Sequence, residues 1–301
     1  RRLPPPHPAA GAGDLRMAMA AAESGDFELD KLNAAADRTA TGGLRGHHQQ
    51  NALYPADCLP CIPQYTLDNL TLPGEIQTLH LYDDSLLAAL SQALATGGEL
   101  THVPMDHAAA EHRVFQLAPY GTLIRVMNIR PSVKQSKFGD RSESQLVTVL
   151  GLRPVGIGKV QQEYPFMLTK VGRMDPPLGG TPPGSPPSGP DLDLAVLQEQ
   201  LQEHFKACQA LREHLGLTGT SSAANLEDQL QAWAATAGED CSEWGTHVQA
   251  LASLEGMSPE LRLEALQLAG AAEAQWVLNF ACRALDEERR RLLALKALNG
   301  L

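Results

Sequence analysis

The stretch that decides the fold is Leu72-Pro73-Gly74-Glu75-Ile76-Gln77-Thr78-Leu79-His80-Leu81-Tyr82. Pro73 fixes φ at the first central position of a turn, and Gly74 accepts a positive φ at the next, so the pair predicts a turn. The residues after it alternate, which predicts a strand with apolar contacts on both sides. One face of this strand would carry Ile76, Thr78, His80 and Tyr82, and the other Gln77, Leu79 and Leu81.

A helix is expected directly after this strand. Asp83-Asp84-Ser85 suits an N-cap and a first helical turn, and the leucines at 86, 87, 90 and 94 follow with helical spacing. The unit is therefore a turn, a strand and a capped helix.

Short apolar runs, broken by glycine and proline, continue from residue 58 to residue 176 and predict about six strands in all. A polar loop is expected from residue 134 to 144, and a hairpin is expected where the strand ending at Arg153 returns. Besides residues 76–82, the segments from which these strands would come are Leu59–Pro63, Glu99–Pro104, one beginning near Val114, Tyr120–Ile129, the two arms of the hairpin (Gln145–Arg153 and Val155–Val160) and Tyr164–Val171.

The C-terminal part is predicted to be helical, after a semi-stiff linker rich in proline, glycine and serine. Apolar residues recur every three or four positions from Leu194 to Leu215, which predicts a helix of about six turns. Shorter helices are expected from Asn225 to Trp233 and from Trp244 to Leu254. Ser258-Pro259-Glu260 is a strong start signal for a helix that runs to about Leu298, with a break near Gly270. Its buried stripe would include Trp276, Phe280, Leu285, Leu292 and Leu295.

These motifs resemble the LON substrate-binding domain, the N-terminal domain of Lon proteases that also occurs in stand-alone proteins. Leu59-Pro60-Cys61-Ile62-Pro63 is similar to the first strand of the family, Leu72–Glu75 to its turn, and Tyr120–Ile129 to its Gly-Thr-Leu/Val-Ala-Arg strand. Thr78-Leu79-His80-Leu81-Tyr82 is most similar to plastid-targeted members of plants and algae. The chain departs from the family at Asp83–Leu86, where Glu-Pro/Ala-Arg-Tyr is usual, so no role of that Arg or Tyr is transferred.

The resemblance implies an α+β fold, in which a PUA-like, mainly β pseudo-barrel with an inserted helix precedes a C-terminal helical bundle. The expected division of the chain is a flexible N-terminal arm (1–57), the pseudo-barrel (58–176), the linker (177–190) and the helical lobe (191–301).

The charge distribution argues against nucleic-acid binding. Of the net charge of −11, residues 191–301 contribute −9, from 8 Lys/Arg against 17 Asp/Glu, and an acidic surface repels phosphates. Apolar runs are too short to span a membrane. The five cysteines do not form a disulfide framework, which indicates a reducing compartment.

Catalytic, cofactor and metal motifs are absent from the sequence. The nearest approach to a phosphate-binding loop, Gly151–Val160, lacks the required glycine and Ser/Thr, and no Gly-x-Ser-x-Gly motif occurs. Cys58-Leu59-Pro60-Cys61 raises a thiol-redox alternative, although it precedes a strand rather than a helix. His80, His102, His107 and His112 match no metal-ligand motif, so we interpret them as core or surface residues.

We therefore expect a non-enzymatic protein without cofactors that binds other proteins in the chloroplast stroma. It would act as a substrate-recognition adaptor or assembly factor, holding apolar segments in a groove at the joint between its two lobes. The candidate lining residues are Leu79, Leu81, Tyr82, Tyr120 and Phe166. The alternatives are a constitutive subunit of a large plastid complex and a redox protein that uses Cys58 and Cys61.

Overall fold

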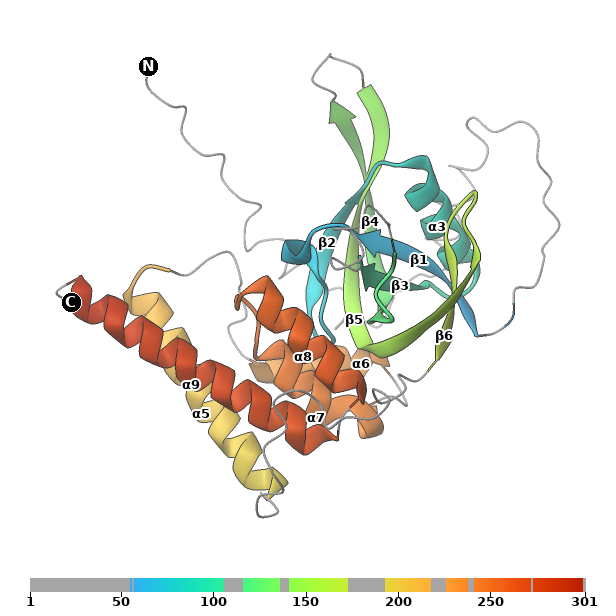
Figure 1. Ribbon diagram of the computed structural model, residues 1–301. Coiled ribbons are helices and arrows are strands. Elements are labelled where there is room, and N and C mark those ends of the chain that lie inside the picture. Colours follow the sequence, from blue (N-terminus) through green and yellow to red (C-terminus); the bar gives the residue numbers. More distant parts are fainter. Residues whose placement is uncertain are drawn as a thin grey trace, which may run out of the picture.

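The computed structural model describes residues 55, 57–105, 116–135, 141–172, 193–217, 226–237, 241–271 and 273–299. A six-stranded sheet comes first and a group of helices follows (Figure 1), so the chain has the mixed α and β fold that its sequence predicts. The strands are β1 (Cys58–Gln64), β2 (Ile76–Leu81), β3 (Glu99–Pro104), β4 (Tyr120–Gln135), β5 (Arg141–Gln162) and β6 (Leu168–Gly172). The helices are η1 (Leu67–Asn69), α3 (Asp84–Ala95), α5 (Leu194–His214), α6 (Leu226–Ala237), α7 (Cys241–Ala252), α8 (Pro259–Ala271) and α9 (Ala274–Leu298).

Several predictions fall outside the described residues. They are the linker 177–190, the histidines 107 and 112, the start of the strand expected near Val114, and the N-terminal arm apart from Pro55 and Asp57.

Five strands of the sheet form a closed ring of pairings. The order is β2-β5-β4-β3-β1-β6, and β5 also pairs with β6, which joins the two ends of the run β5-β4-β3-β1-β6. The pair β1–β3 is parallel and the others are antiparallel. Among the described strands, β2 alone pairs on one side only, with β5.

The prediction of a hairpin near Arg153 is wrong, because β5 continues without a turn through residues 141–162. Gly151 is present for a different reason. Its amide donates to the Glu75 carbonyl and its carbonyl accepts from Gly74, both at 2.9 Å. A Cβ atom at position 151 would lie 2.1 Å from the Leu72 carbonyl oxygen. The glycine therefore allows the Leu72–Glu75 turn to lie against β5, and the connection from β4 to β5 comes earlier in the chain.

The two-sided strand expected at residues 76–82 is buried on one side. Leu79 and Leu81 are in the core, whereas Thr78, His80 and Tyr82 are exposed. The helix prediction is confirmed: α3 has Asp83 as its N-cap, with a carboxylate oxygen that accepts from the Ser85 amide at 2.9 Å. Helix α3 packs into the same apolar cluster as these leucines, through Ala89, Leu90 and Ala93, and it lies against β1 and β3.

The two long helices, α5 and α9, lie side by side (Figure 1). The Cys282 thiol contacts the Leu197 carbonyl near their starts, and Arg212 pairs with Glu288 further on, so they run in the same direction. The start at Ser258-Pro259 is confirmed, and the expected break separates α8 from α9. Of the expected stripe, Leu285 and Leu292 are fully buried and the other three are partly buried. None of the described helices combines the length and apolar composition needed to cross a membrane.

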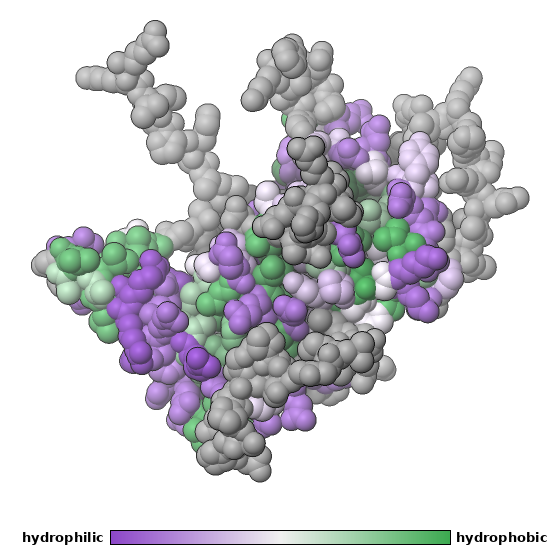
Figure 2. All heavy atoms as spheres, viewed as in Figure 1, coloured by the Kyte–Doolittle hydropathy of each residue, from purple (hydrophilic) through white to green (hydrophobic). Residues whose placement is uncertain are grey.

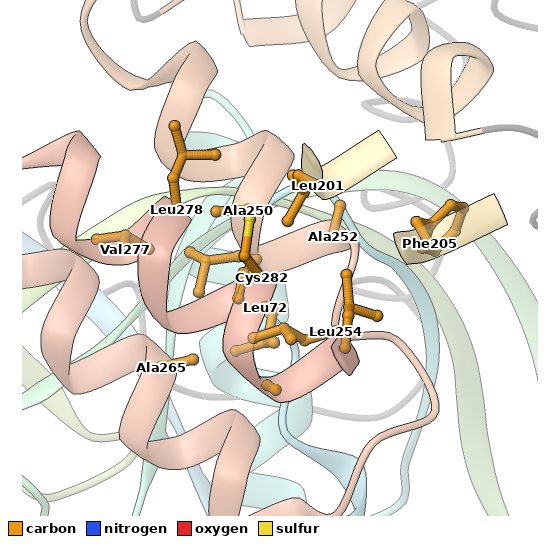
Figure 3. Packing of buried hydrophobic residues seen from close by; sticks show 14 of the residues in the cluster. Leu72, Leu201, Phe205, Ala250, Ala252, Leu254, Ala265, Val277, Leu278 and Cys282 are labelled. Carbon is orange, nitrogen blue, oxygen red and sulfur yellow. The ribbon is translucent and has the colours of Figure 1, made fainter. Parts of the chain in front are cut away.

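Residues of the sheet region belong to the core of the helices. Leu70 and Leu72 are fully buried in the cluster formed by α5, α7, α8 and α9. Figure 3 shows Leu72 among Cys282, Ala265 and Leu254. A second cluster joins Leu152 and Val155 of β5 to Trp233 of α6. The sheet and the helices therefore share their hydrophobic cores.

The position of Gly151 generates a stability prediction. We expect Gly151→Ala to lower the free energy of unfolding by about 2–3 kcal/mol, because the added methyl group meets backbone rather than a flexible side chain. Gly158→Ala is the matched control in the same strand, since its nearest contacts are 3.4 Å away on Lys170, and it should cost less than about 1 kcal/mol. Urea unfolding of both variants makes the comparison, and equal effects would contradict it.

Candidate functional site

The joint between sheet and helices, where the sequence suggests a binding groove, is filled by packed side chains in the described structure. Gly74 has φ +86°, and a Cβ there would lie 2.7 Å from Cγ1 of Val248 in α7. The Trp233 indole, which is buried, donates to the Leu152 carbonyl at 2.8 Å. The groove prediction is therefore wrong for these residues, because both parts bury apolar side chains in the space between them.

A buried ion pair lies in the same joint. Arg262 of α8 contacts the Glu75 carboxylate at 2.5 Å and donates to the Leu70 carbonyl at 2.7 Å. The same carboxylate oxygen, Oε2, accepts from the Leu72 amide at 2.9 Å. Burial raises the pKa of Glu75 to about 7, although Arg262 and the Leu72 amide act in the opposite direction. Oε1 of Glu75 has no hydrogen-bond partner among the described residues, which is consistent with the dominance of burial.

His102 lies inside the sheet region, in a network of polar side chains. Its Nδ1 is 2.9 Å from the Thr71 hydroxyl and its Nε2 is 3.1 Å from Oε1 of Gln64. Burial lowers the pKa of His102 to about 4, so the imidazole is neutral near pH 7. The core interpretation of this histidine is confirmed. No group of three or more potential metal ligands occurs in the described residues.

His80 has a different environment, on the exposed face of β2. Its Nε2 is 2.8 Å from the Ser144 hydroxyl, and its ring lies edge-on to Tyr82. Within the described part of the chain, no carboxylate bonds to the His80 ring in the way that would orient the base of a serine hydrolase. The arrangement can therefore offer hydrogen bonds and an aromatic surface, but it contains no assembled catalytic group.

The five predicted binding residues are not brought together. Leu79, Leu81 and Phe166 are buried in the cluster beside α3. Tyr120 packs against the core of the helices, whereas Tyr82 is 46% exposed. Of the five, Tyr82 is the member whose side chain is presented to solvent.

Sequence reasoning missed the outer edge of β2, where Thr78 and His80 are exposed beside Tyr82. The signal was present in the alternation itself: the positions between the buried leucines are polar, which is typical of a sheet with one solvated face.

A second exposed surface lies on the helices. Leu217, just after α5, is 50% exposed, and Leu293 and Leu298 of α9 are 47% and 81% exposed. We call these three residues the helical tip. Figure 2 shows hydrophobic surface at this end of the α5–α9 pair. Exposed apolar groups of this kind mark contact surfaces.

The cysteine pair gives no support to redox chemistry. Cys58 and Cys61 are both buried in β1, where positions three apart are separated by about 10 Å and point to opposite faces, too far for a disulfide. Burial raises the pKa of Cys61 to about 12 and also raises the pKa of Cys58. Both thiols therefore stay protonated and unreactive.

The buried carboxyl predicts a pH-dependent effect of Glu75→Gln. The folded state keeps the proton up to about pH 7, whereas an exposed carboxyl loses it near 4.5. As pH rises through this window the wild type therefore loses stability, by about 3 kcal/mol in full, and the glutamine variant does not. We therefore expect the free energy of unfolding of the variant, relative to that of the wild type, to increase by about this amount between about pH 5 and pH 8. Chemical unfolding at several pH values measures it.

Two features make this measurement interpretable. His102 acts in the opposite direction, because its lowered pKa removes stability as pH falls from 6.5 towards 4, so the difference between variant and wild type is the informative quantity. Glu99→Gln, in the more exposed ion pair with Arg125 at 2.6 Å, is the control for the loss of a less buried carboxylate. A Glu75→Gln variant that is less stable than wild type at every pH would show that pairing with Arg262 outweighs burial.

The cysteine geometry predicts protection from thiol reagents. In a Cys241→Ser background, the native protein should show no fast reaction with a disulfide reagent such as DTNB at about pH 8. Unfolding in guanidinium should then make four thiols accessible to the reagent. They belong to Cys58, Cys61, Cys208 and Cys282, all of which are buried in the folded protein. A fast reaction at Cys58 or Cys61 in the native state would revive the redox alternative.

Comparison with known proteins relates this architecture to one family. The family model described as the ATP-dependent protease La (LON) substrate-binding domain matches residues 59–271. No curated protein matches the chain. Among solved structures, the N-terminal domain of Mycobacterium avium complex Lon protease is 15% identical, with a TM-score of 0.43, and the match covers 76% of this chain and 98% of that one. The Lon N-terminal domain protein from Xanthomonas campestris is 17% identical, with a TM-score of 0.38 and coverage of 73% and 96%.

The family match begins in β1 and ends with α8, so it includes the sheet, α3 and the Glu75–Arg262 joint, while α9 lies beyond it. Because the match spans more than half of the sequence, this chain belongs to the LON substrate-binding domain family.

Proposed function

We propose that this chain is a non-catalytic module that binds apolar segments of other proteins, and that it serves in the plastid as a substrate-recognition adaptor or assembly factor. Membership of a substrate-binding domain family supports protein binding. The observation that carries the proposal is the exposure of large aromatic side chains on the sheet region: Tyr65, Tyr82 and Tyr164 are 63%, 46% and 86% exposed. Aromatic residues are enriched where proteins bind one another.

The plastid location rests on the likeness of Thr78–Tyr82 to plastid-targeted members of the family. The ring of strand pairings supports the expectation of a PUA-like pseudo-barrel. Such a ring leaves few unpaired strand edges, and this directs binding to β2 and to exposed side chains.

Direct binding tests the proposal. The purified protein is titrated with fluorescently labelled lactalbumin, either folded or permanently unfolded by reduction and carboxymethylation. We expect binding of the unfolded form only. Tyr82→Ser should weaken it at least about fivefold, which corresponds to the loss of one aromatic contact. Leu298→Ser, a control at the distant helical tip, should leave the affinity within about twofold. Failure of the wild type to bind the unfolded chain would overturn the proposal.

The helical tip favours a second candidate, a constitutive subunit of a larger plastid complex. Leu217, Leu293 and Leu298 would then be covered permanently by a neighbour. Affinity purification of the tagged protein from plastids, followed by quantitative mass spectrometry, separates the two candidates. The subunit is favoured if one set of partners is recovered at constant ratio. These partners should be lost when all three leucines are replaced by serine and kept in the control Leu194→Ser/Val196→Ser. A broad range of substoichiometric partners would favour the adaptor.

A further inference from the structure

Strand β2 presents unused backbone hydrogen-bonding groups along its outer edge. The Gly151 amide bonds to the Glu75 carbonyl, and the register pairs Ile76 with Leu150. In an antiparallel ladder, hydrogen-bonded and non-hydrogen-bonded pairs alternate. Residues 77, 79 and 81 therefore bond to β5, and the amide and carbonyl groups of Ile76, Thr78 and His80 point away from it. In the part of the chain that the structure describes, no strand pairs with this edge.

The residues of β2 do not protect this edge. Natural edge strands are commonly shielded by lysine, proline or a bulge, but Ile76-Gln77-Thr78-Leu79-His80-Leu81 contains neither residue type and pairs with β5 in unbroken register. An unshielded edge of this length accepts an additional strand.

The exposed side of β2 carries Thr78, His80 and Tyr82 at its end, and none of these is a carboxylate, a lysine or an arginine. The Thr78 hydroxyl lies 3.5 Å from that of Thr148 on β5, and the next pairs on this side are His80 with Ser144 and His80 with Tyr82. Short hydroxyl side chains leave room beside the edge, and Tyr82 offers an aromatic surface at its end. A strand added here would therefore place alternate side chains against Thr78 and Tyr82.

Carboxylates gather where β2 ends. Asp83 and Asp84 follow Tyr82 and are exposed, and Glu143 of β5 is exposed two residues before Gln145, the partner of Leu81. Hydrogen bonds from Ser85 lower the pKa of Asp83, so this carboxylate is ionised. The local charge favours a basic residue in whatever lies beside the end of β2.

We propose that the outer edge of β2 binds an extended segment of another protein as an added strand, with alternating β-branched or apolar residues and a basic residue beside Asp83 and Asp84. This inference rests on the proposed protein-binding function and assigns its site and its type of ligand. The segment bonds through its backbone to Ile76, Thr78 and His80, so its sequence is restricted mainly at the basic end and at the position next to Tyr82.

The test uses the full chain and three labelled peptides. The first alternates threonine and valine and has two lysines at each end, so that it is independent of strand direction. The second peptide has glutamates in place of the lysines. The third peptide has the sequence of the first, but every second backbone amide is N-methylated, on the edge that would face β2. Two variants complete the set: Thr78→Pro removes an outward amide and leaves the bonds to β5 in place, and Thr78→Ala changes only the side chain.

We expect the lysine peptide to bind wild type and Thr78→Ala with about equal affinity. It should bind Thr78→Pro at least about tenfold more weakly, because a tenfold loss of affinity corresponds to the loss of one to two net hydrogen bonds. The glutamate and N-methylated peptides should bind at least about fivefold more weakly than the lysine peptide. Hydrogen exchange of the wild type provides a second measurement that does not depend on the folding of Thr78→Pro: the amides of Ile76, Thr78 and His80 should become protected when the peptide is added.

Three outcomes would overturn the inference. Equal affinity of Thr78→Pro and wild type, without new protection in β2, would place binding elsewhere, and binding of unfolded lactalbumin would then still uphold the proposed function. Protection of the same three amides in the free protein would mean that another segment of this chain already pairs there. Absence of binding to both the peptides and unfolded lactalbumin would overturn the inference together with the proposed function.

Discussion

The contact between the Leu72–Glu75 turn and helices α7 and α8 is the constraint on which the rest of the structure depends. Leu72 is buried among the helices, Gly74 touches Val248, and Glu75 pairs with Arg262. The same turn bonds to Gly151 of β5 on its other side. These four residues therefore contact both the sheet and the helices, and the Trp233–Leu152 hydrogen bond adds a second connection.

This packing determines where the protein can bind a partner. Apolar side chains from both parts fill the joint around Gly74, Val248 and Trp233. Inside the sheet region, His102 and Thr71 bond to each other. Ring closure pairs five strands with a neighbour on each side along part of their length. Two exposed sites for contact in the described residues are the outer edge of β2 with Tyr82 and the apolar helical tip, and Tyr65 and Tyr164 are exposed as well. A recognition role and an assembly role can therefore be assigned to different residues.

Local patterns predicted most elements of the fold, because each depends on neighbours in the chain. The turn at Pro73-Gly74, the Asp83 cap and the start at Ser258-Pro259 are short-range signals, and all are found in the structure. The prediction of a hairpin near Arg153 failed because glycine occurs both in turns and where two backbone segments approach closely. Gly151 looked like part of a turn, but it is required by the close approach of Leu72, which lies almost eighty positions earlier and is invisible to any local window.

For the candidate site, the sequence by itself determined three things. The chain has no catalytic or cofactor motif, residues 76–82 alternate as in a strand, and the motifs are similar to those of one family of protein-binding domains. Only the tertiary structure decided which of these residues reach the surface. Leu79, Leu81 and Phe166 pack under α3, Tyr120 turns to the helices, and Tyr82 remains exposed. The physical reason is that alternation specifies two faces of a strand, whereas the burial of each face and the pairing of each edge depend on distant segments that pack against them.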